Sequence, residues 1–224
     1  MLDTHVHLVS SDHERYPLKA SPAAWVCEAP VDAERFVAEM AEAGVERAVL
    51  VQPLGAYGGD NSYAADSAAR WPRRFASVCA VDHTGAGAAE RVSEWIEQRG
   101  MNGVRLMAIP DASVLDEAHA TPLAQRAERL GIPVVVAVMH AALPRLLAFL
   151  TRHPNLPVAL DHCGFPDLTG GPPYSAARNV FELACFPNLT LELTSLVLET
   201  ASHHGDSRRF VSRLVDYFGP QRIM

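Results

Sequence analysis

The chain has 224 residues, of which 49% are hydrophobic and 20% charged, and its formal net charge is -7. This composition fits one soluble globular domain, and the scattered basic residues exclude the concentrated basic patch of a nucleic-acid-binding protein. The longest strongly apolar run, "PVVVAVM", is far shorter than the roughly 20 residues that span a bilayer, which excludes a membrane segment. Four cysteines without a C-x-x-C pair, and no secretory pattern at the N-terminus, predict a cytoplasmic protein.

Strand and helix patterns alternate along the whole chain. Seven β-type runs are predicted, at 2–8, 46–53, 74–82, 102–108, 133–139, 157–162 and 189–194. Helical patterns lie between them, at 31–44, 88–100, 122–131 and 143–154, and several end in glycine, which closes a helix in the left-handed conformation. This alternation predicts an α/β protein with a parallel sheet.

The lengths of the connections between strands and helices favour a TIM barrel over an open doubly wound sheet. Helix-to-strand links are tight, whereas the strand-to-helix links at 9–31, 53–60, 109–120 and 163–175 are long, and no glycine-rich phosphate turn follows the first strand. Loops elaborated after the strands are typical of a TIM barrel. The last residues, "YFGPQRIM", read as a helix end, a turn and the start of an eighth strand. We therefore predict a single (β/α)8 TIM-barrel domain over 1–224, with its eighth strand and C-terminal end truncated.

The stretch "LDTHVHL" places two histidines on one face of the first strand. Side chains alternate faces along a strand, so His5 and His7 point the same way, with Asp3 beside them. The pair has two interpretations of equal weight on spacing alone: half-buried rings satisfied by backbone carbonyls, or two nitrogen ligands that converge on one point.

Polar residues recur where the other predicted strands end, and several of them together indicate a site at the barrel mouth. Each also has a structural interpretation: Arg105 can form an ion pair, for example with Glu192, and His83 and His140 can be ordinary loop residues. The whole set is His5, His7, Gln52, His83, Arg105, His140, Asp161, His162, Glu192 and Thr194.

With these residues in place, the chain resembles the second amidohydrolase family. The likeness rests on "LDTHVHL", "VLVQPLGAYGGDNSY", "NGVRL", "ALDHCGFPDLTGGPPY" and "GPQRIM", in that order over nearly the whole chain. The His-x-His and Asp-His-x-Gly motifs are fairly specific, while "VQP" and "GVRL" alone are weak. The family includes lactonases and decarboxylases, so the resemblance implies a barrel with bond cleavage at its mouth.

The resemblance also assigns residues. The family's first-strand histidines fall on His5 and His7, its sixth-strand histidine on His162, and its substrate-facing arginine on Arg105. Members that bind a metal carry a histidine on the fifth strand, where this chain has Ala137 or apolar neighbours and His140 only beyond the strand. The family's aspartate, which binds metal or acts as the base, is expected just after Met224.

Together these observations predict a hydrolase, a lactonase that opens a cyclic ester of a small organic acid by water attack. The predicted catalytic residues are His162, His5 and His7, and the predicted substrate-binding residues are Arg105, Gln52, His140 and Glu192. Either no cofactor is needed or one divalent ion, Zn or Mn, is held by His5 and His7. The alternatives are a metal-dependent non-oxidative decarboxylase of an aromatic or muconate-like acid, and an inactive barrel or binding protein.

The partner is a small-molecule substrate, with no nucleic acid and no membrane, and a homo-oligomer is left open. Cys163 follows His162 directly and is interpreted as a packing residue, because neighbours on a strand do not face each other. The tract "SHHGD" at 202–206 is interpreted as a loop that caps the last helix through Asp206.

Overall fold

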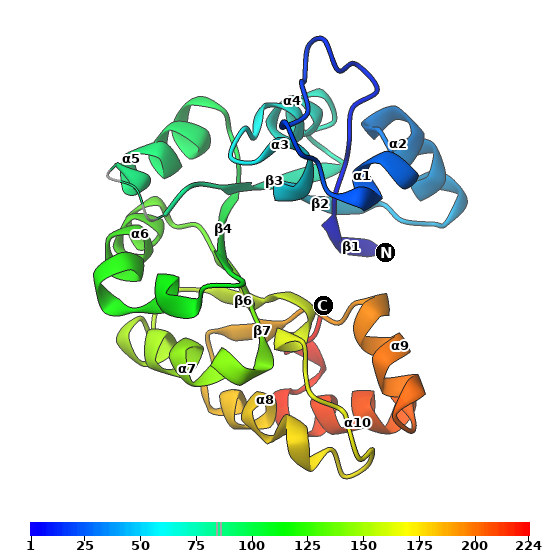
Figure 1. The fold of residues 1–224 in the computed structure, drawn as a ribbon, viewed down its shortest axis with the longest axis vertical. Coiled ribbons are helices and arrows are strands. Elements are labelled where there is room, and N and C mark those ends of the chain that lie inside the picture. The colour runs from blue at the N-terminus through cyan, green and yellow to red at the C-terminus, as the bar shows by residue number, and fades with distance from the viewer. Residues whose placement is uncertain (84, 86) are drawn as a thin grey trace. The chain divides into compact units, whose positions relative to one another are not determined.

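The computed structural model describes residues 1–83, 85 and 87–224. The chain divides into two compact units, Met1–Arg105 and Leu106–Met224. In both units parallel strands alternate with helices, as the sequence predicts (Figure 1). The closed eight-stranded barrel and the single-domain organisation stay predictions.

The first unit holds a parallel sheet whose strands pair in chain order. Apolar side chains of β2 and β3 are almost fully buried, with Leu50 and Cys79 at 1% and 0% exposure, as expected for strands covered on both faces. The elements are β1 (Leu2–Val6), α1 (Ala24–Glu28), α2 (Ala33–Glu42), β2 (Arg47–Val51), α3 (Leu54–Tyr57), α4 (Ser62–Arg70), β3 (Phe75–Ala80), α5 (Ala88–Ser93), the π-helical turn η1 (Glu94–Gln98) and the start of β4 (Gly103–Ala108).

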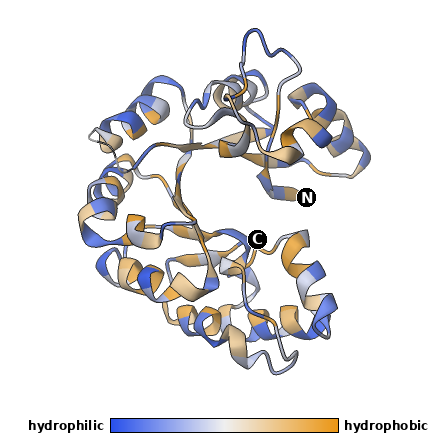
Figure 2. Ribbon diagram, viewed as in Figure 1, coloured by the Kyte–Doolittle hydropathy of each residue, from blue (hydrophilic) through white to orange (hydrophobic). Residues whose placement is uncertain are grey.

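Helix α2 shows how local sequence sets these elements. Asp32 caps its N-terminus by accepting a hydrogen bond from the Arg35 amide, and the helix ends before Gly44, which has a positive φ of 68°. Met40 is buried and Phe36 stacks on Phe75 of β3, so one face of the helix covers the sheet. Figure 2 shows the mixed hydrophilic and hydrophobic character that such a helix carries.

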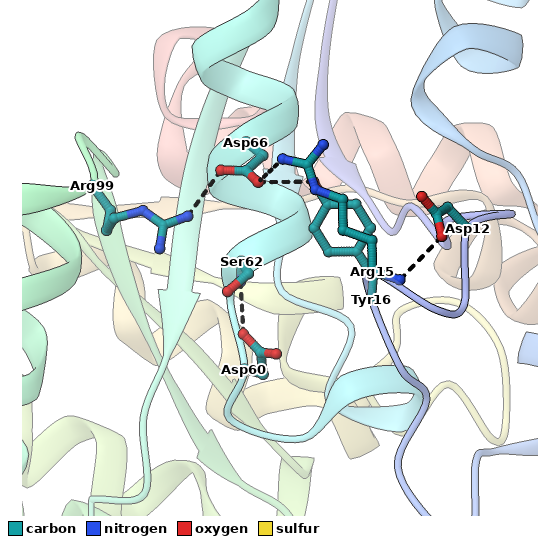
Figure 3. A network of polar contacts seen from close by, with 7 residues as sticks. All are labelled: Asp12, Arg15, Tyr16, Asp60, Ser62, Asp66 and Arg99. Atoms are coloured by element: carbon teal, nitrogen blue, oxygen red, sulfur yellow. Dashed lines mark hydrogen bonds and ion pairs between the residues drawn. The ribbon is translucent and has the colours of Figure 1, made fainter.

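The loop between β1 and α2 is tied to α4 by a polar network. Arg15 and Tyr16 reach the carboxylate of Asp66 at 3.2 and 2.8 Å, and Arg99 reaches its other oxygen at 2.8 Å (Figure 3). Burial and the bond to Asp66 raise the pKa of Tyr16 to about 12, so this phenol keeps its donating proton at neutral pH. The long loop therefore has a defined path.

The second unit repeats the pattern. Strands β5, β6 and β7 pair in parallel and in chain order, and every residue of β5 is buried. Its elements are the end of β4, η2 (Ala112–Leu115), α6 (Glu117–Leu130), β5 (Val134–Val138), η3 (His140–Ala142), α7 (Leu143–Arg152), β6 (Val158–Leu160), η4 (Asp161–Gly164), η5 (Ser175–Ala177), α8 (Arg178–Glu182), η6 (Leu183–Cys185), β7 (Leu189–Leu191), α9 (Ser195–His203), α10 (Ser207–Phe218) and η7 (Pro220–Arg222).

The last residues lie along β7. Ile223 forms a parallel bridge with Leu191, and Met224 exchanges backbone hydrogen bonds with Leu191 and Leu193 at 2.9 and 2.8 Å. The prediction that "RIM" begins to pair as a strand after a turn is confirmed at this bridge.

All seven predicted strands are confirmed, but several are shorter than predicted. The sixth ends at Leu160 and the seventh at Leu191, so the placing of Asp161, His162, Glu192 and Thr194 on these strands was wrong. A left-handed turn begins at His162 and breaks the extended conformation there. Asp161 and Glu192 directly follow their strands instead, and His162 and Thr194 lie a little further along the chain. Among the described helices, none combines the length and apolarity needed to cross a bilayer.

Candidate active site

The two histidines of "LDTHVHL" meet in the first unit. The Nε2 atoms of His5 and His7 lie 3.3 Å apart, and the rings meet edge to face with centroids 4.7 Å apart. Both side chains are half-buried. The prediction that alternation along β1 turns them to one side is confirmed, although β1 itself ends one residue before His7.

The tautomer of His7 follows from its other nitrogen. His7 Nδ1 lies 2.8 Å from the carbonyl oxygen of Val51 at the end of β2. A carbonyl only accepts hydrogen bonds, so Nδ1 carries the proton and the Nε2 of neutral His7 presents a lone pair toward His5. His7 therefore donates a hydrogen bond through Nε2 only when the ring carries a second proton.

This geometry suits a divalent cation. Two nitrogen ligands of a tetrahedral zinc ion, each at about 2.0 to 2.1 Å, stand roughly 3.3 Å apart, which is the separation of the two Nε2 atoms. A ligating histidine also typically donates its second N–H to a backbone carbonyl, as His7 does to Val51. His5 and His7 are thus able to hold a metal ion or to share a proton.

Gln52, directly after β2, is fully buried and anchors the loop that follows it. Its amide nitrogen donates to the carbonyl oxygens of Gly58 and Asp60, at 3.0 and 2.7 Å. Both N–H groups are therefore used within the loop. A substrate-binding role for Gln52, which stays a prediction, would have to use its carbonyl oxygen Oε1.

Arg105 lies in β4, paired in register with Ala80, and is only 5% exposed. A charged group so deeply buried is costly to the fold unless a polar or charged partner accepts its hydrogen bonds. Its predicted contact with a substrate carboxylate stays a prediction.

In the second unit, His162 lies in a left-handed turn. His162, Cys163, Gly164 and Phe165 all have positive φ, between 49° and 70°. Such values are uncommon for residues other than glycine and are strained, so the surrounding structure must hold them. Residues with strained backbone conformations are common at functional sites, and here the conformation of the turn sets the direction of the His162 imidazole.

The contacts that hold this turn come from β7 and the residues after it. The Cys163 amide donates to the Glu192 carbonyl oxygen at 3.0 Å, and the Glu192 amide donates to Leu160 at 3.0 Å. His162 Nδ1 lies 3.0 Å from the hydroxyl of Thr194. The ring of Phe165 packs against His162 with centroids 4.8 Å apart. Thr194 thus orients His162, a role that the sequence did not assign to it.

The remaining candidates have distinct placements. Glu192 is 2% exposed just after β7, and His140 begins η3 after Met139, beyond the end of β5 as predicted. Cys163 is fully buried, donates its S–H to the Glu192 carbonyl oxygen at 3.3 Å, and has its pKa raised by burial to about 12. A thiol with so high a pKa is not an activated nucleophile, which supports the packing interpretation.

Asp206 caps α10, as predicted. Its carboxylate accepts hydrogen bonds from the amides of Arg208 and Arg209 at 2.9 and 3.3 Å. The bonds satisfy two of the open N–H groups at the start of the helix.

The fold is that of a parallel βα protein, a class whose active sites lie in the loops after the strands. The histidine pair lies at such a position, at the end of β1. A family model described as "Amidohydrolase" matches residues 2–224. The chain belongs to this amidohydrolase family and is a hydrolase, which confirms the family resemblance. Its relatives include an L-fucono-1,5-lactonase from Burkholderia ambifaria, 29% identical over an alignment of 232 positions that covers all of this chain and 78% of the relative.

Solved structures of other proteins share the fold of this chain. A protein assigned as a 2-pyrone-4,6-dicarboxylic acid hydrolase from Pseudomonas putida superposes with a TM-score of 0.79 at 21% identity, over all of this chain and 80% of that one. An amidohydrolase from Burkholderia multivorans, with bound zinc, gives a TM-score of 0.73 at 23% identity, over all of this chain and 82% of its own.

Proposed function

We propose that the protein is a lactonase that opens the ring of a small cyclic ester by attack of water on the carbonyl carbon. The observation that carries the proposal is the His5–His7 pair, with its Nε2 atoms 3.3 Å apart and His7 fixed by Val51. The family and the lactonase relative support the same reaction class.

In this reaction water adds to the carbonyl carbon, and the carbonyl oxygen becomes negative before the ring C–O bond breaks. The products are a carboxylate and a hydroxyl group on one open chain. A pair of imidazoles stabilises this charge when a proton lies between them, because the proton can be donated to the developing oxyanion. A divalent cation held by the Nε2 atoms of His5 and His7 would instead supply Lewis-acid polarisation of the carbonyl.

His162 is proposed as a further catalytic group. Its ring is held by the strained turn and by Thr194 at Nδ1, and its Nε2 is proposed as the nitrogen that acts on the substrate. Arg105 is proposed to bind a substrate carboxylate, and Glu192, Gln52 and His140 stay proposed substrate contacts. With one arginine assigned, a neutral or mono-anionic lactone suits the chain better than a dicarboxylate.

The test is acid release from a panel of 1,5- and 1,4-lactones, followed with a pH indicator in weak buffer, with and without added zinc or manganese. Hydrolysis that falls by about a hundredfold in His162→Ala supports both the reaction and the residue. Unchanged turnover in that variant would remove His162 from the mechanism. Carbon dioxide release from aromatic acids, without lactone hydrolysis, would favour the decarboxylase alternative.

A further inference from the structure

An exposed indole lies against the histidine pair. Trp25, on the short helix α1 in the loop after β1, stacks on His7 with ring centroids 5.7 Å apart and planes 21° from parallel. Trp25 is 40% exposed, which is high for so large an apolar side chain. The indole therefore offers open aromatic surface beside a nitrogen pair that can act on a carbonyl.

The position of Trp25 is fixed from several sides. The Ala23 amide donates to the Gly55 carbonyl oxygen at 2.9 Å, and Val26 anchors α1 in the core at 2% exposure. The indole also packs closely on Gly55, where an added Cβ would lie 3.2 Å from Cζ2 and Nε1 of Trp25. The absence of a side chain at Gly55 thus leaves room for the indole in this position, where it also contacts His7.

We infer that Trp25 is a specificity-determining residue, whose indole face binds the C–H face of a saturated, hydroxylated lactone ring of the sugar-acid type. This inference rests on the proposed lactonase function. The face of an indole is electron-rich, and hydrogens on carbons that carry oxygen are partly positive, so the two surfaces attract each other. The ring so placed brings its ester carbonyl to the side of the indole where His7 lies.

The same chemistry disfavours a planar dicarboxylate. The negative face of an aromatic ring repels carboxylates, which bind instead to cationic groups. A dicarboxylate needs more than one such group, whereas Arg105 alone is proposed to bind a carboxylate. A polyhydroxy lactone that carries at most one carboxylate, for Arg105, avoids this repulsion. Its hydroxyl groups remain free to form hydrogen bonds at the ring edge, while the C–H face covers the indole.

The test uses the full chain and three variants. Trp25→Phe keeps an aromatic face, Trp25→Leu keeps apolar bulk without one, and Trp95→Phe makes the same aromatic exchange elsewhere in the first unit. Each is assayed for kcat and KM with an aldono-1,5-lactone. Binding of the corresponding lactam, in which N–H replaces the ring oxygen, is measured by calorimetry, and the unfolding midpoint verifies folding.

We expect Trp25→Leu to raise KM and the lactam Kd by about tenfold, with kcat within about threefold of wild type. Trp25→Phe should retain most of the affinity, and Trp95→Phe all of it. Equal affinities in the Leu and Phe variants, or a fall in kcat alone, would overturn the inference while leaving the lactonase function standing. A wild-type protein that hydrolyses no lactone would overturn both.

Discussion

His7 donates its Nδ1 hydrogen to the carbonyl oxygen of Val51, 2.8 Å away. This single bond joins the residue after β1 to the end of β2 and determines which nitrogen of neutral His7 carries the proton. The lone pair on Nε2 then lies 3.3 Å from Nε2 of His5, a separation at which two rings are able to share a proton or hold a cation.

Removing one ring of the His5–His7 pair should abolish its contribution to lactone hydrolysis. We expect His7→Ala to lower kcat/KM for lactone hydrolysis by about a hundredfold or more, because a donor or ligand at the developing charge is lost. The exposed His13 provides a matched control, and His13→Ala should retain wild-type rates. Wild-type activity in His7→Ala would exclude the pair from the reaction.

Thr194 should act through His162. Thr194→Val removes the hydroxyl that lies 3.0 Å from Nδ1, and we expect kcat to fall by about tenfold with an altered pH profile, since the imidazole loses the partner that orients it. Thr194→Ser keeps the hydroxyl and should restore most of the rate. If valine and serine gave the same kcat and pH profile, Thr194 would have no positioning role.

Cys163 should be inert in the folded protein. Because burial raises its pKa to about 12 and Cys79 is equally buried, a thiol reagent should modify only Cys27 and Cys185, the two exposed cysteines. All four should react after unfolding. Rapid modification of Cys163 in the native state, with loss of activity, would contradict the packing role.

His153 should make the protein less stable in mild acid. Burial lowers the pKa of His153 below its ordinary value of 6.5, despite the nearby carboxylate of Glu128. The unfolded chain therefore binds a proton more readily than the folded one. The stabilisation is present above pH 6.5 and is lost as the pH falls through the folded pKa.

The variant His153→Phe keeps a ring but cannot titrate. We expect the urea midpoint of wild type to fall more between pH 7 and pH 5 than that of His153→Phe. Equal decreases in the two proteins would show that another group accounts for the acid sensitivity.

The sequence predicted the strands because buried strands leave continuous apolar runs. "VVVAV" in β5 is buried at every residue, and the alternation in "LDTHVHL" correctly brought His5 and His7 to one side. These are short-range properties of the chain. The same reasoning missed α1 and α3, since helices of five and four residues carry too little periodic pattern.

Long-range contacts could not be predicted in this way. The turn from His162 to Phe165 contains three residues other than glycine with positive φ, which local preference disfavours and which bonds to Glu192 and Thr194 hold in place. The stacking of Trp25 on His7 likewise joins a loop helix to a strand end. Neither the left-handed turn nor the exposed indole has a signature in a single sequence.

The most direct test of the central claim is a turnover in water labelled with oxygen-18, using an aldono-1,5-lactone and mass spectrometry of the product. We predict an acid that carries one labelled oxygen in its carboxylate, since water attacks the carbonyl carbon and the ring oxygen leaves as the hydroxyl group. Label in the hydroxyl group, or no enzyme-dependent acid product, would contradict the account.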